Sequence, residues 1–407
     1  MSSTEIIQKF DWKLMIILLL LLVFGELALY SASVQKVGEE IIVSDFYIKQ
    51  LVWIIMGLAV FFTILYIPDV ILDLLIVPYN ILIFLMLILV LILPSIKGVH
   101  RWISLGSVHI QPSEFAKIGV IFLLAKVFSI KYIPTSKIVL FGFLIATLPA
   151  LLVLIQPDLG STLVFFAILF PMMYFAGVSF FTLFIIVTPL ISILVGFNIT
   201  YWIIFDIFLL LVLIFRKVSL LPAGAILVGN AFISLVTPFM WWSMHDYQRN
   251  RILAFINPKF DVLGSGYQII QSKIAVGSGG IFGKGFLQGT QKNLNFLPEQ
   301  QTDFIFSVIG EELGFVGCFI LMLLFGALIW RIVIILRKIR IDRQRLIIVG
   351  ILAYFIFQIV VNIGMNIGII PVVGIPLPFV SYGGSSLLLN LASMGLIFKY
   401  ARERSFV

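Results

Sequence analysis

The chain of 407 residues is strongly apolar: 61% of its residues are hydrophobic, 14% are aromatic and 11% are charged. Water-soluble domains carry about 25% charged residues, so the composition excludes an ordinary soluble protein and predicts an all-α polytopic integral membrane protein. The formal net charge is +8, from 27 Lys and Arg against 19 Asp and Glu. In a membrane protein such an excess sets orientation and attracts anionic membrane lipids, and we expect no nucleic-acid partner.

Apolar runs long enough to cross a bilayer, about 20 residues each, follow one another along the chain. We expect one membrane domain over residues 1–407 with about 10–12 transmembrane helices. The runs lie at residues 12–32, 47–67, 75–95, 112–130, 137–155, 161–177, 180–197, 200–215, 218–240, 304–330, 346–364 and 385–399.

The basic residues orient this series of runs. Lys and Arg gather in the cytoplasmic connections of membrane proteins, and here they follow the fourth, eighth and tenth runs and fill the C-terminal tail. They are Lys126, Lys131, Lys137, Arg216, Lys217, Arg331, Arg337, Lys338, Arg340, Arg343, Arg345, Lys399, Arg402 and Arg404. We therefore expect both termini in the cytoplasm, and the residues between the other runs outside.

The longest outside segment, residues 241–303, departs from this charge rule. It carries many glycines and six cations on the side where Lys and Arg are normally scarce. The cations are Arg249, Arg251, Lys259, Lys273, Lys284 and Lys292. A basic, Gly-rich segment in this place predicts a site for an anion, because backbone N–H groups and positive charge both favour one.

Asp303 ends this segment and opens the tenth run, where water meets lipid. At 100° per residue, Ser307, Gly310 and Gly314 fall within about 40° of it on a helix, so a small and polar stripe follows it into the membrane. A carboxylate in this position could cap the helix or act as a general base, a role worth typically 10²–10⁴-fold. The neighbouring cations and Glu299 favour the base.

Charged residues also stand at the outside ends of the earlier runs. Glu114 and Lys117 share one helical face; they either pair and orient the helix or, together with Arg101, face a cavity that receives a charged group. Asp158 lies in a tight turn before the sixth run. We expect its carboxylate to cap the following helix by accepting from the N–H of Gly160 or Ser161.

The last outside connection, residues 368–386, is apolar but interrupted by Pro and Gly. Non-helical backbone at membrane depth is tolerated only where it packs on protein or lines a cavity. The sequence therefore predicts a re-entrant wall here. The interrupting residues are Pro371, Gly374, Pro376, Pro378, Gly383 and Gly384.

Nucleotide and metal motifs are missing from the sequence. It has no Walker motif, and its three His and one Cys form no zinc-type cluster. Nucleotide cofactors are scarce outside the cytoplasm, so the substrate of a transfer reaction there must carry its own leaving group. A lipid-linked diphosphate carries one, and its negative charge can bind Lys and Arg. The sequence establishes no cofactor. A Mg²⁺ or Mn²⁺ ion that bridges the diphosphate to Asp303 or Glu299 is an open alternative.

Seven strings, in order along nearly the whole chain, resemble the SEDS family (shape, elongation, division and sporulation). They are Arg101-Trp102-Ile103, Gln111-Pro112-Ser113-Glu114 with Lys117, Gln156-Pro157-Asp158-Leu159-Gly160, His245 to Arg249, Gly266 to Gly285, Leu297 to Phe306, and Pro376 to Ser385. Within the family, Gly289-Thr290-Gln291 and Pro371 to Pro376 follow the rod-shape branch rather than the division branch.

This resemblance implies a peptidoglycan glycosyltransferase of the bacterial inner membrane that polymerises lipid II during cell elongation, with an extracytoplasmic active site. It implies a class B penicillin-binding protein, a crosslinking transpeptidase, as partner. It also implies that Asp303 is catalytic and that the matching motif positions serve the substrate. Those positions are Arg101, Glu114, Lys117, Asp158, Arg249, Lys273 and Glu299.

The chain departs from the family in one region. The family usually has ten spans, whereas residues 178–240 hold about one hairpin more, so we expect an additional helical hairpin there. Two other functions stay open beside polymerisation. A broken helix and intramembrane charges also suit a lipid II flippase or other transporter, and an apolar outer face suits a scaffold that recruits a transpeptidase.

Overall fold

The computed structural model describes residues 10–37, 40–94, 100–106, 108–244, 249, 253, 265–293 and 299–403. Twelve long helices account for most of these residues, and each coincides with one predicted apolar run. They are α2 (Trp12–Ser33), α3 (Phe46–Tyr66), α4 (Asp69–Ile92), α5 (Pro112–Phe128), α6 (Thr135–Ile155), α7 (Leu159–Phe175), α8 (Phe180–Val195), α9 (Ile199–Phe215), α10 (Leu220–Ser243), α14 (Ile305–Leu336), α15 (Asp342–Asn366) and α16 (Gly384–Glu403).

Seven of the helices in the described ranges are long and apolar enough to cross a membrane: α2, α3, α4, α6, α10, α14 and α15. Three more, α7, α8 and α9, are apolar but shorter. A helix pairs its own backbone N–H and C=O groups, which lipid cannot do for it. The predicted fold class, an all-α polytopic membrane protein, is confirmed.

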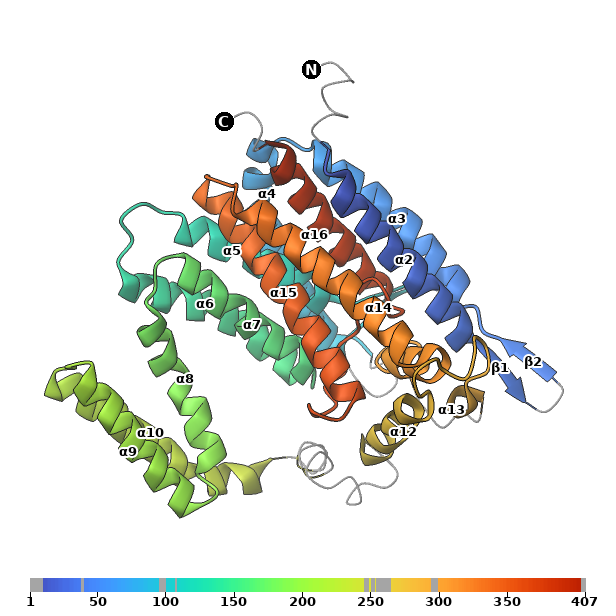
Figure 1. Cartoon of the computed structure of the whole chain (residues 1–407). Coiled ribbons are helices and arrows are strands. Elements are labelled where there is room, and N and C mark those ends of the chain that lie inside the picture. Colours follow the sequence, from blue (N-terminus) through green and yellow to red (C-terminus); the bar gives the residue numbers. More distant parts are fainter. Residues whose placement is uncertain are drawn as a thin grey trace.

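The start of α2 and the end of α16 lie at one end of the helical bundle, here called the termini end (Figure 1). The opposite end, the loop end, carries two short helices, α12 (Ser265–Ser278) and α13 (Thr290–Asn293). It also carries two antiparallel hairpins, β1 (Val34–Val37) with β2 (Glu40–Val43), and β3 (Ile103–Leu105) with β4 (Val108–Ile110). In their registers Val34 is opposite Val43, and Ile103 is opposite Ile110.

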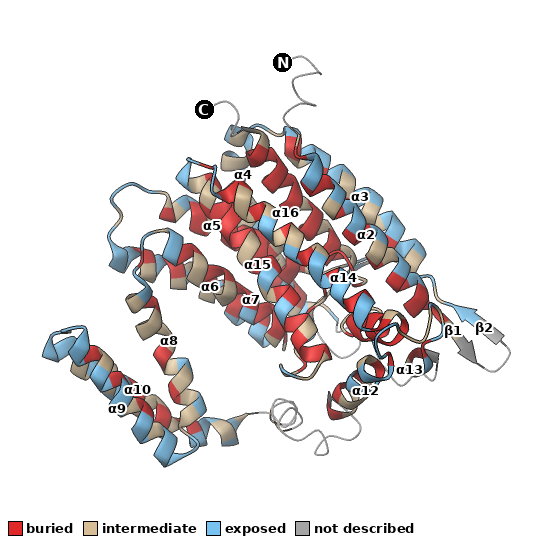
Figure 2. Ribbon diagram, viewed as in Figure 1, coloured by how far each residue is buried: buried red, intermediate tan, exposed pale blue. Residues whose placement is uncertain are grey.

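The helix α15 lies at the centre of the fold. In the most apolar stretch of α15, 72% of the residues are buried inside the protein, whereas in that of α10 only 17% are buried. Figure 2 shows the same contrast. The helix α15 packs on α5, α7 and α14, while α16 packs mainly on α3. Side chains that α15 sends toward the loop end are therefore held rigidly by neighbours on several sides.

Residues 178–240, where the sequence predicts an additional hairpin, contain α8, α9 and α10. These helices pack on one another around an apolar cluster of their own, formed by Phe205, Leu209 and Leu213. The helices α8 and α10 are joined by a buried hydrogen bond between side chains, from Ser192 Oγ to Asn230 Oδ1 at 2.7 Å. The three helices reach the main bundle through the contact of α8 with α7, and Figure 1 shows α9 and α10 well apart from α2 and α3.

The helix α14 contains a sharp break at Gly314, whose φ of 64° and ψ of −160° are not helical. Residues 280–285 pair with the backbone groups that the break exposes. Phe315 N donates to Gly280 O at 2.9 Å, and Lys284 N donates to Glu311 O at 3.0 Å. The turn after α12 thus supplies the hydrogen-bond partners that α14 lacks at its break.

We expect Gly314→Ala to destabilise the protein by about 1–3 kcal/mol or more, because a side chain is strained at this φ. A Cβ there would also lie 2.3 Å from Gly283 N and 2.6 Å from Ile281 O. Thermal unfolding of the purified protein in detergent measures the loss. Gly326→Ala is the matched control in the same helix, since a Cβ there meets nothing within 4 Å; equal melting of the two variants would refute the argument.

Candidate active site

Asp303 stands at the loop end immediately before α14, where two asparagines of α15 hold its backbone. Its carbonyl oxygen accepts from Asn362 Nδ2 at 3.0 Å and from Asn366 Nδ2 at 2.9 Å. Both asparagines are fully buried. Asn362 also donates to Ile375 O at 2.8 Å, so it ties Asp303 to the connection between α15 and α16.

That connection, residues 367–383, is the predicted re-entrant wall, and it packs on protein. Two glycines with positive φ, Gly368 and Gly374, bring its backbone against the polar residues. A Cβ at Gly374 would lie 3.4 Å from Asp303 Oδ2, and one at Gly368 would lie 2.5 Å from Lys273 Nζ. Asp303 and Lys273 therefore lie along the same short stretch of backbone.

A chain of small polar contacts fixes Lys273 beside Asp303. Its neighbour Ser272, on α12, is buried and bonds to Ser307 Oγ at 2.5 Å and to Asn366 O at 2.6 Å. Ser307 is one helical turn beyond Asp303. The Lys273 side chain itself is exposed, and among the described residues it has no ion-pair partner.

The stripe of small residues after Asp303 packs against α12. A Cβ at Gly279 would lie 1.9 Å from Gly310 O, so the two backbones touch there. Gly and Ser on this face of α14 thus act as packing residues, the ordinary use of small residues between membrane helices.

The turn before α7 borders the same wall. Asp158 Oδ1 accepts from Ser161 N at 3.1 Å, which confirms the predicted cap, and Oδ2 accepts from Gln111 Nε2 at 3.1 Å. Arg101 donates to the carbonyl oxygens of Gln156 and Pro157 in this turn. A Cβ at Gly160 would lie 2.6 Å from the carbonyl oxygen of Val373 in the wall. Arg101 and Asp158 therefore shape the turn that supports the wall.

Glu299 is exposed at the loop end, with a φ of 54°. Its carbonyl oxygen accepts from Asp303 N at 3.2 Å and from Thr302 N at 3.1 Å. Nearby, Tyr382 N donates to Gln301 O at 2.9 Å, and burial raises the pKa of the Tyr382 phenol. Its hydroxyl therefore stays protonated at neutral pH and can donate a hydrogen bond.

Glu114 and Lys117 lie inside the bundle. They form an ion pair and are 3% and 2% exposed, so the charge-pair interpretation is confirmed. Lys117 Nζ lies 5.5 Å from the ring centre of Tyr354. That tyrosine precedes Asn362 on α15 by about 12 Å along the helix axis at 1.5 Å per residue. Contact of Glu114 or Lys117 with a substrate stays a prediction.

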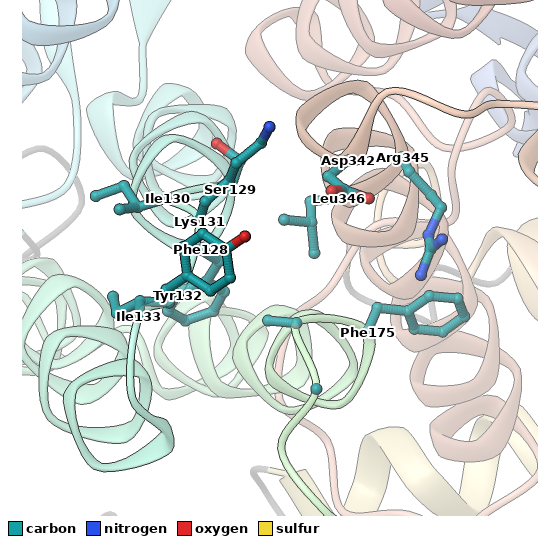
Figure 3. Close-up of a pocket in the computed structure, with 12 residues that line it drawn as sticks. Phe128, Ser129, Ile130, Lys131, Tyr132, Ile133, Phe175, Asp342, Arg345 and Leu346 are labelled. Carbon is teal, nitrogen blue, oxygen red and sulfur yellow. The ribbon is translucent and has the colours of Figure 1, made fainter.

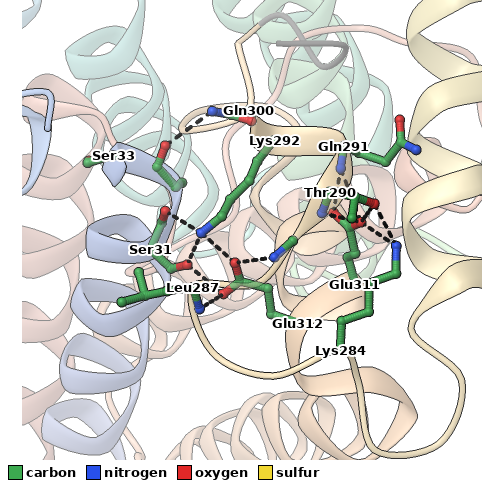
Figure 4. A network of polar contacts seen from close by, with 12 residues as sticks. Ser31, Ser33, Lys284, Leu287, Thr290, Gln291, Lys292, Gln300, Glu311 and Glu312 are labelled. Carbon is green, nitrogen blue, oxygen red and sulfur yellow. Dashed lines mark hydrogen bonds and ion pairs between the residues drawn. The ribbon is translucent and has the colours of Figure 1, made fainter. Parts of the chain in front are cut away.

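Two of the six cations in the loop are engaged by buried glutamates of α14 (Figure 4). Lys292 Nζ lies 2.5 Å from Glu312 Oε1 with both side chains buried, and Lys284 Nζ lies 2.7 Å from Glu311 Oε1. Lys292 also donates to Ser31 Oγ of α2 at 2.7 Å. These two lysines, which belong to the basic segment from which the sequence predicted an anion site, instead fasten the loop to the bundle.

Besides these lysines and Lys273, Arg249 is the other cation of this segment among the described residues. The Arg249 guanidinium lies 6.0 Å from the ring centre of Trp242, and its contact with substrate stays a prediction. Arg251 and Lys259, like residues 245–248 and 297–298 of the strings that resemble the family, lie outside the described residues.

The structure offers no preformed metal site among the residues it describes, because no three His, Cys, Asp or Glu side chains there could hold one ion. Asp303 and Glu299 alone do not complete the coordination shell of Mg²⁺ or Mn²⁺, which takes six ligands in near-octahedral geometry. The bridging ion stays an untested prediction, and no step below depends on it.

Sequence reasoning missed the residues that position Asp303 and the glutamates that take up the lysines. Two signals were available. Asn362 and Asn366 are four apart in an apolar run, hence on one helical face, and polar residues inside a span are costly unless they have partners. Glu311 and Glu312 adjoin in another apolar run and needed cations on the same grounds.

We expect Lys292→Met to destabilise the protein by about 3–5 kcal/mol, because it leaves the buried Glu312 carboxylate uncompensated. Lys284→Met should cost less, since that side chain is 27% exposed. Thermal unfolding in detergent compares the two, with Lys338→Met on the exposed connection after α14 as control. Similar melting of the Lys292 and Lys338 variants would show that the buried pair contributes little.

An exposed lysine, a half-buried carboxylate and a wall of irregular backbone thus meet at one end of a polytopic membrane bundle. Such a site can hold a charged lipid headgroup and accept a proton from an attacking hydroxyl. The fold and the site define a membrane-embedded group-transfer enzyme. The sequence matches the family FTSW_RODA_SPOVE, described as "Cell cycle protein", over residues 11–205 and 183–406, and the chain belongs to this family.

Curated relatives are similar in sequence to this chain over nearly its full length. Peptidoglycan glycosyltransferase MrdB of Escherichia coli K12 is 37% identical, over 98% of this chain and 95% of its own length. Peptidoglycan glycosyltransferase RodA of Treponema pallidum is 34% identical, over 96% and 97%. The predicted SEDS membership is confirmed, and the chain is a peptidoglycan glycosyltransferase.

Solved structures show the same fold. A chain of a peptidoglycan synthase complex, studied for the coordination of polymerization and crosslinking, has a TM-score of 0.73 and 30% identity, over 97% of this chain and 98% of that chain. Rod shape determining protein RodA of Thermus thermophilus has a TM-score of 0.62 and 26% identity, over 97% of both chains.

Proposed function

We propose that this enzyme polymerises lipid II into glycan strands during cell-wall elongation, with Asp303 as the general base. The acceptor's sugar 4-hydroxyl attacks the anomeric carbon of the donor, and Asp303 takes the hydroxyl proton. A β-1,4 bond forms with inversion while the bond to the polyprenyl diphosphate breaks. The observation that carries the proposal is the clamp on Asp303: two buried asparagines fix its backbone while its side chain stays half-buried at the loop end.

The Lys273 ammonium supports departure of the diphosphate. A cation placed where negative charge develops stabilises the transition state more than the bound substrate. Lys273 is exposed, lies along Gly368 of the wall and is tied to α14 and α15 through Ser272. Arg101 and Asp158 act indirectly: they hold the turn before α7, and residues 367–383 pack against that turn.

The protein has a proposed orientation in the membrane and a proposed partner protein. Basic residues at the termini end, together with the positive-inside rule, support cytoplasmic termini and an extracytoplasmic site in the bacterial inner membrane. A class B penicillin-binding protein is the proposed partner, because the solved relative with a TM-score of 0.73 belongs to a synthase complex that couples polymerization and crosslinking. Strands made at the loop end would then emerge on the side where a transpeptidase acts.

Asp303→Asn should lower polymerisation at least 100-fold, since the amide cannot accept the proton in a general-base step. Glycan length is measured with purified enzyme, its partner and lipid II, with crosslinking blocked. Asp45→Asn, an exposed carboxylate at the same end, is the matched control and should keep full activity.

Equal polymer from the Asp303→Asn variant and the wild type would refute the base assignment. Movement of labelled lipid II across sealed vesicles that survives Asp303→Asn while polymer is absent would instead support the transporter alternative.

Lys273→Ala should lower kcat about 10–100-fold, because a lysine that acts on the leaving group is felt mainly in the transition state. Lys273→Arg should retain more activity than the alanine variant, since it keeps the positive charge. Steady-state polymerisation at several lipid II concentrations separates kcat from KM. A change in KM alone would assign Lys273 to ground-state binding.

A further inference from the structure

A pocket of about 320 Å³ opens at the termini end, far from Asp303 (Figure 3). Three parts of the chain form it: the connection from α5 to α6, the end of α7 with the turn that follows, and the first turns of α15. Arg345 and Asp342 stand on the α15 side, and residues 129–133 stand opposite. The reaction proposed above uses none of these residues.

The basic groups of this pocket differ from three cations at the same end of the bundle that form ion pairs. Arg331 pairs with Asp11, Arg343 with Asp73 and Lys399 with Asp69. Within the described part of the chain, Lys131 and Arg345 have no carboxylate within ion-pair distance.

The Arg345 guanidinium instead lies 5.7 Å from the ring centre of Phe175. This stacking orients the guanidinium while leaving its N–H donors available to an anion. Asp342 is exposed in the pocket and offsets one of the two positive charges. The remaining charge is therefore positive.

Besides these charged groups and Ser129, the lining includes apolar side chains, which continue onto the outer surface. Phe128, Ile133 and Leu346 line the pocket. At its rim Ile130 is 57% exposed and Tyr132 is 99% exposed. Exposed Tyr beside Lys and Arg is typical of the depth at which lipid headgroups lie. A ligand that fits these surroundings carries both a negative group and a hydrocarbon chain.

We propose that this pocket binds the phosphate headgroup of an anionic glycerophospholipid, with Arg345 and Lys131 on the phosphate and the acyl chains along Ile130 and Ile133. Basic pockets between membrane helices bind such headgroups, and each Lys or Arg near the surface strengthens the attraction. The lipid belongs to the cytoplasmic leaflet if the termini are cytoplasmic. The site itself does not depend on the proposed reaction.

The experiment titrates delipidated enzyme in detergent with dioctanoyl phosphatidylglycerol and follows the bound lipid by native mass spectrometry. Dioctanoyl phosphatidylcholine and inorganic phosphate are titrated in parallel. Phosphatidylglycerol should bind the wild type in preference to phosphatidylcholine. Arg345→Gln and Lys131→Ala should each weaken it roughly fivefold, and Arg345→Lys should restore much of the loss.

Lys338→Ala and Arg340→Ala remove exposed cations of the same end that do not line the pocket, and they should bind like the wild type. Each variant is first shown to melt like the wild type; Lys131 lies on an exposed connection, so its test stands even if Arg345→Gln unfolds. Equal binding by Lys131→Ala, or an equal loss in the control variants, overturns the site. Competition by inorganic phosphate at millimolar concentration would show a site for soluble anions and overturn the lipid assignment.

Discussion

Every backbone N–H and C=O group that enters a bilayer must find a partner in the protein, and this requirement explains how an irregular site can sit at the end of a helical bundle. Two departures from helix occur there, at Gly314 in α14 and in residues 367–383. The first is paired by residues 280–285. In the second, Asn362 binds Ile375 O and Ser381 Oγ accepts from Leu377 N at 2.8 Å. Asp303 and Lys273 both lie against the second of these segments, near Gly374 and Gly368.

The polar side chains of the loop end divide into those that build the site and those that remain available to a substrate. Buried partners such as Lys292 with Glu312, or Asn366 with Ser307, are already satisfied, and in surroundings of low dielectric they are rigid. Lys273, in contrast, is exposed, and Asp303 is half-buried. Charge count alone therefore overstates how much of a basic loop is free to bind.

The sequence predicted the helices well because an apolar run about 20 residues long has few alternatives in a membrane. It placed the start of α4 at residue 75 rather than Asp69, because Asp69 and Asp73 lower the local hydropathy. Those carboxylates are tolerated through pairing with Lys399 and Arg343. The sequence shows that polar residues in an apolar run, such as Asn366 and Glu312, need partners. It does not show that those partners are Asp303 O and Lys292, because the pairs come together only in the folded chain. The Asp158 cap is local and was predicted.

The contact of Lys292 with α2 has a consequence for how the protein is made. Lys292 and Ser31 are 261 positions apart in the chain, and Glu312 follows both. During synthesis eight further membrane helices, α3 to α10, are made after α2 and before Lys292 leaves the ribosome. The ion pair therefore closes late. A chain stopped before α14 would retain apolar helices able to insert, but it would lack the Glu312 carboxylate that pairs with Lys292 beside α2.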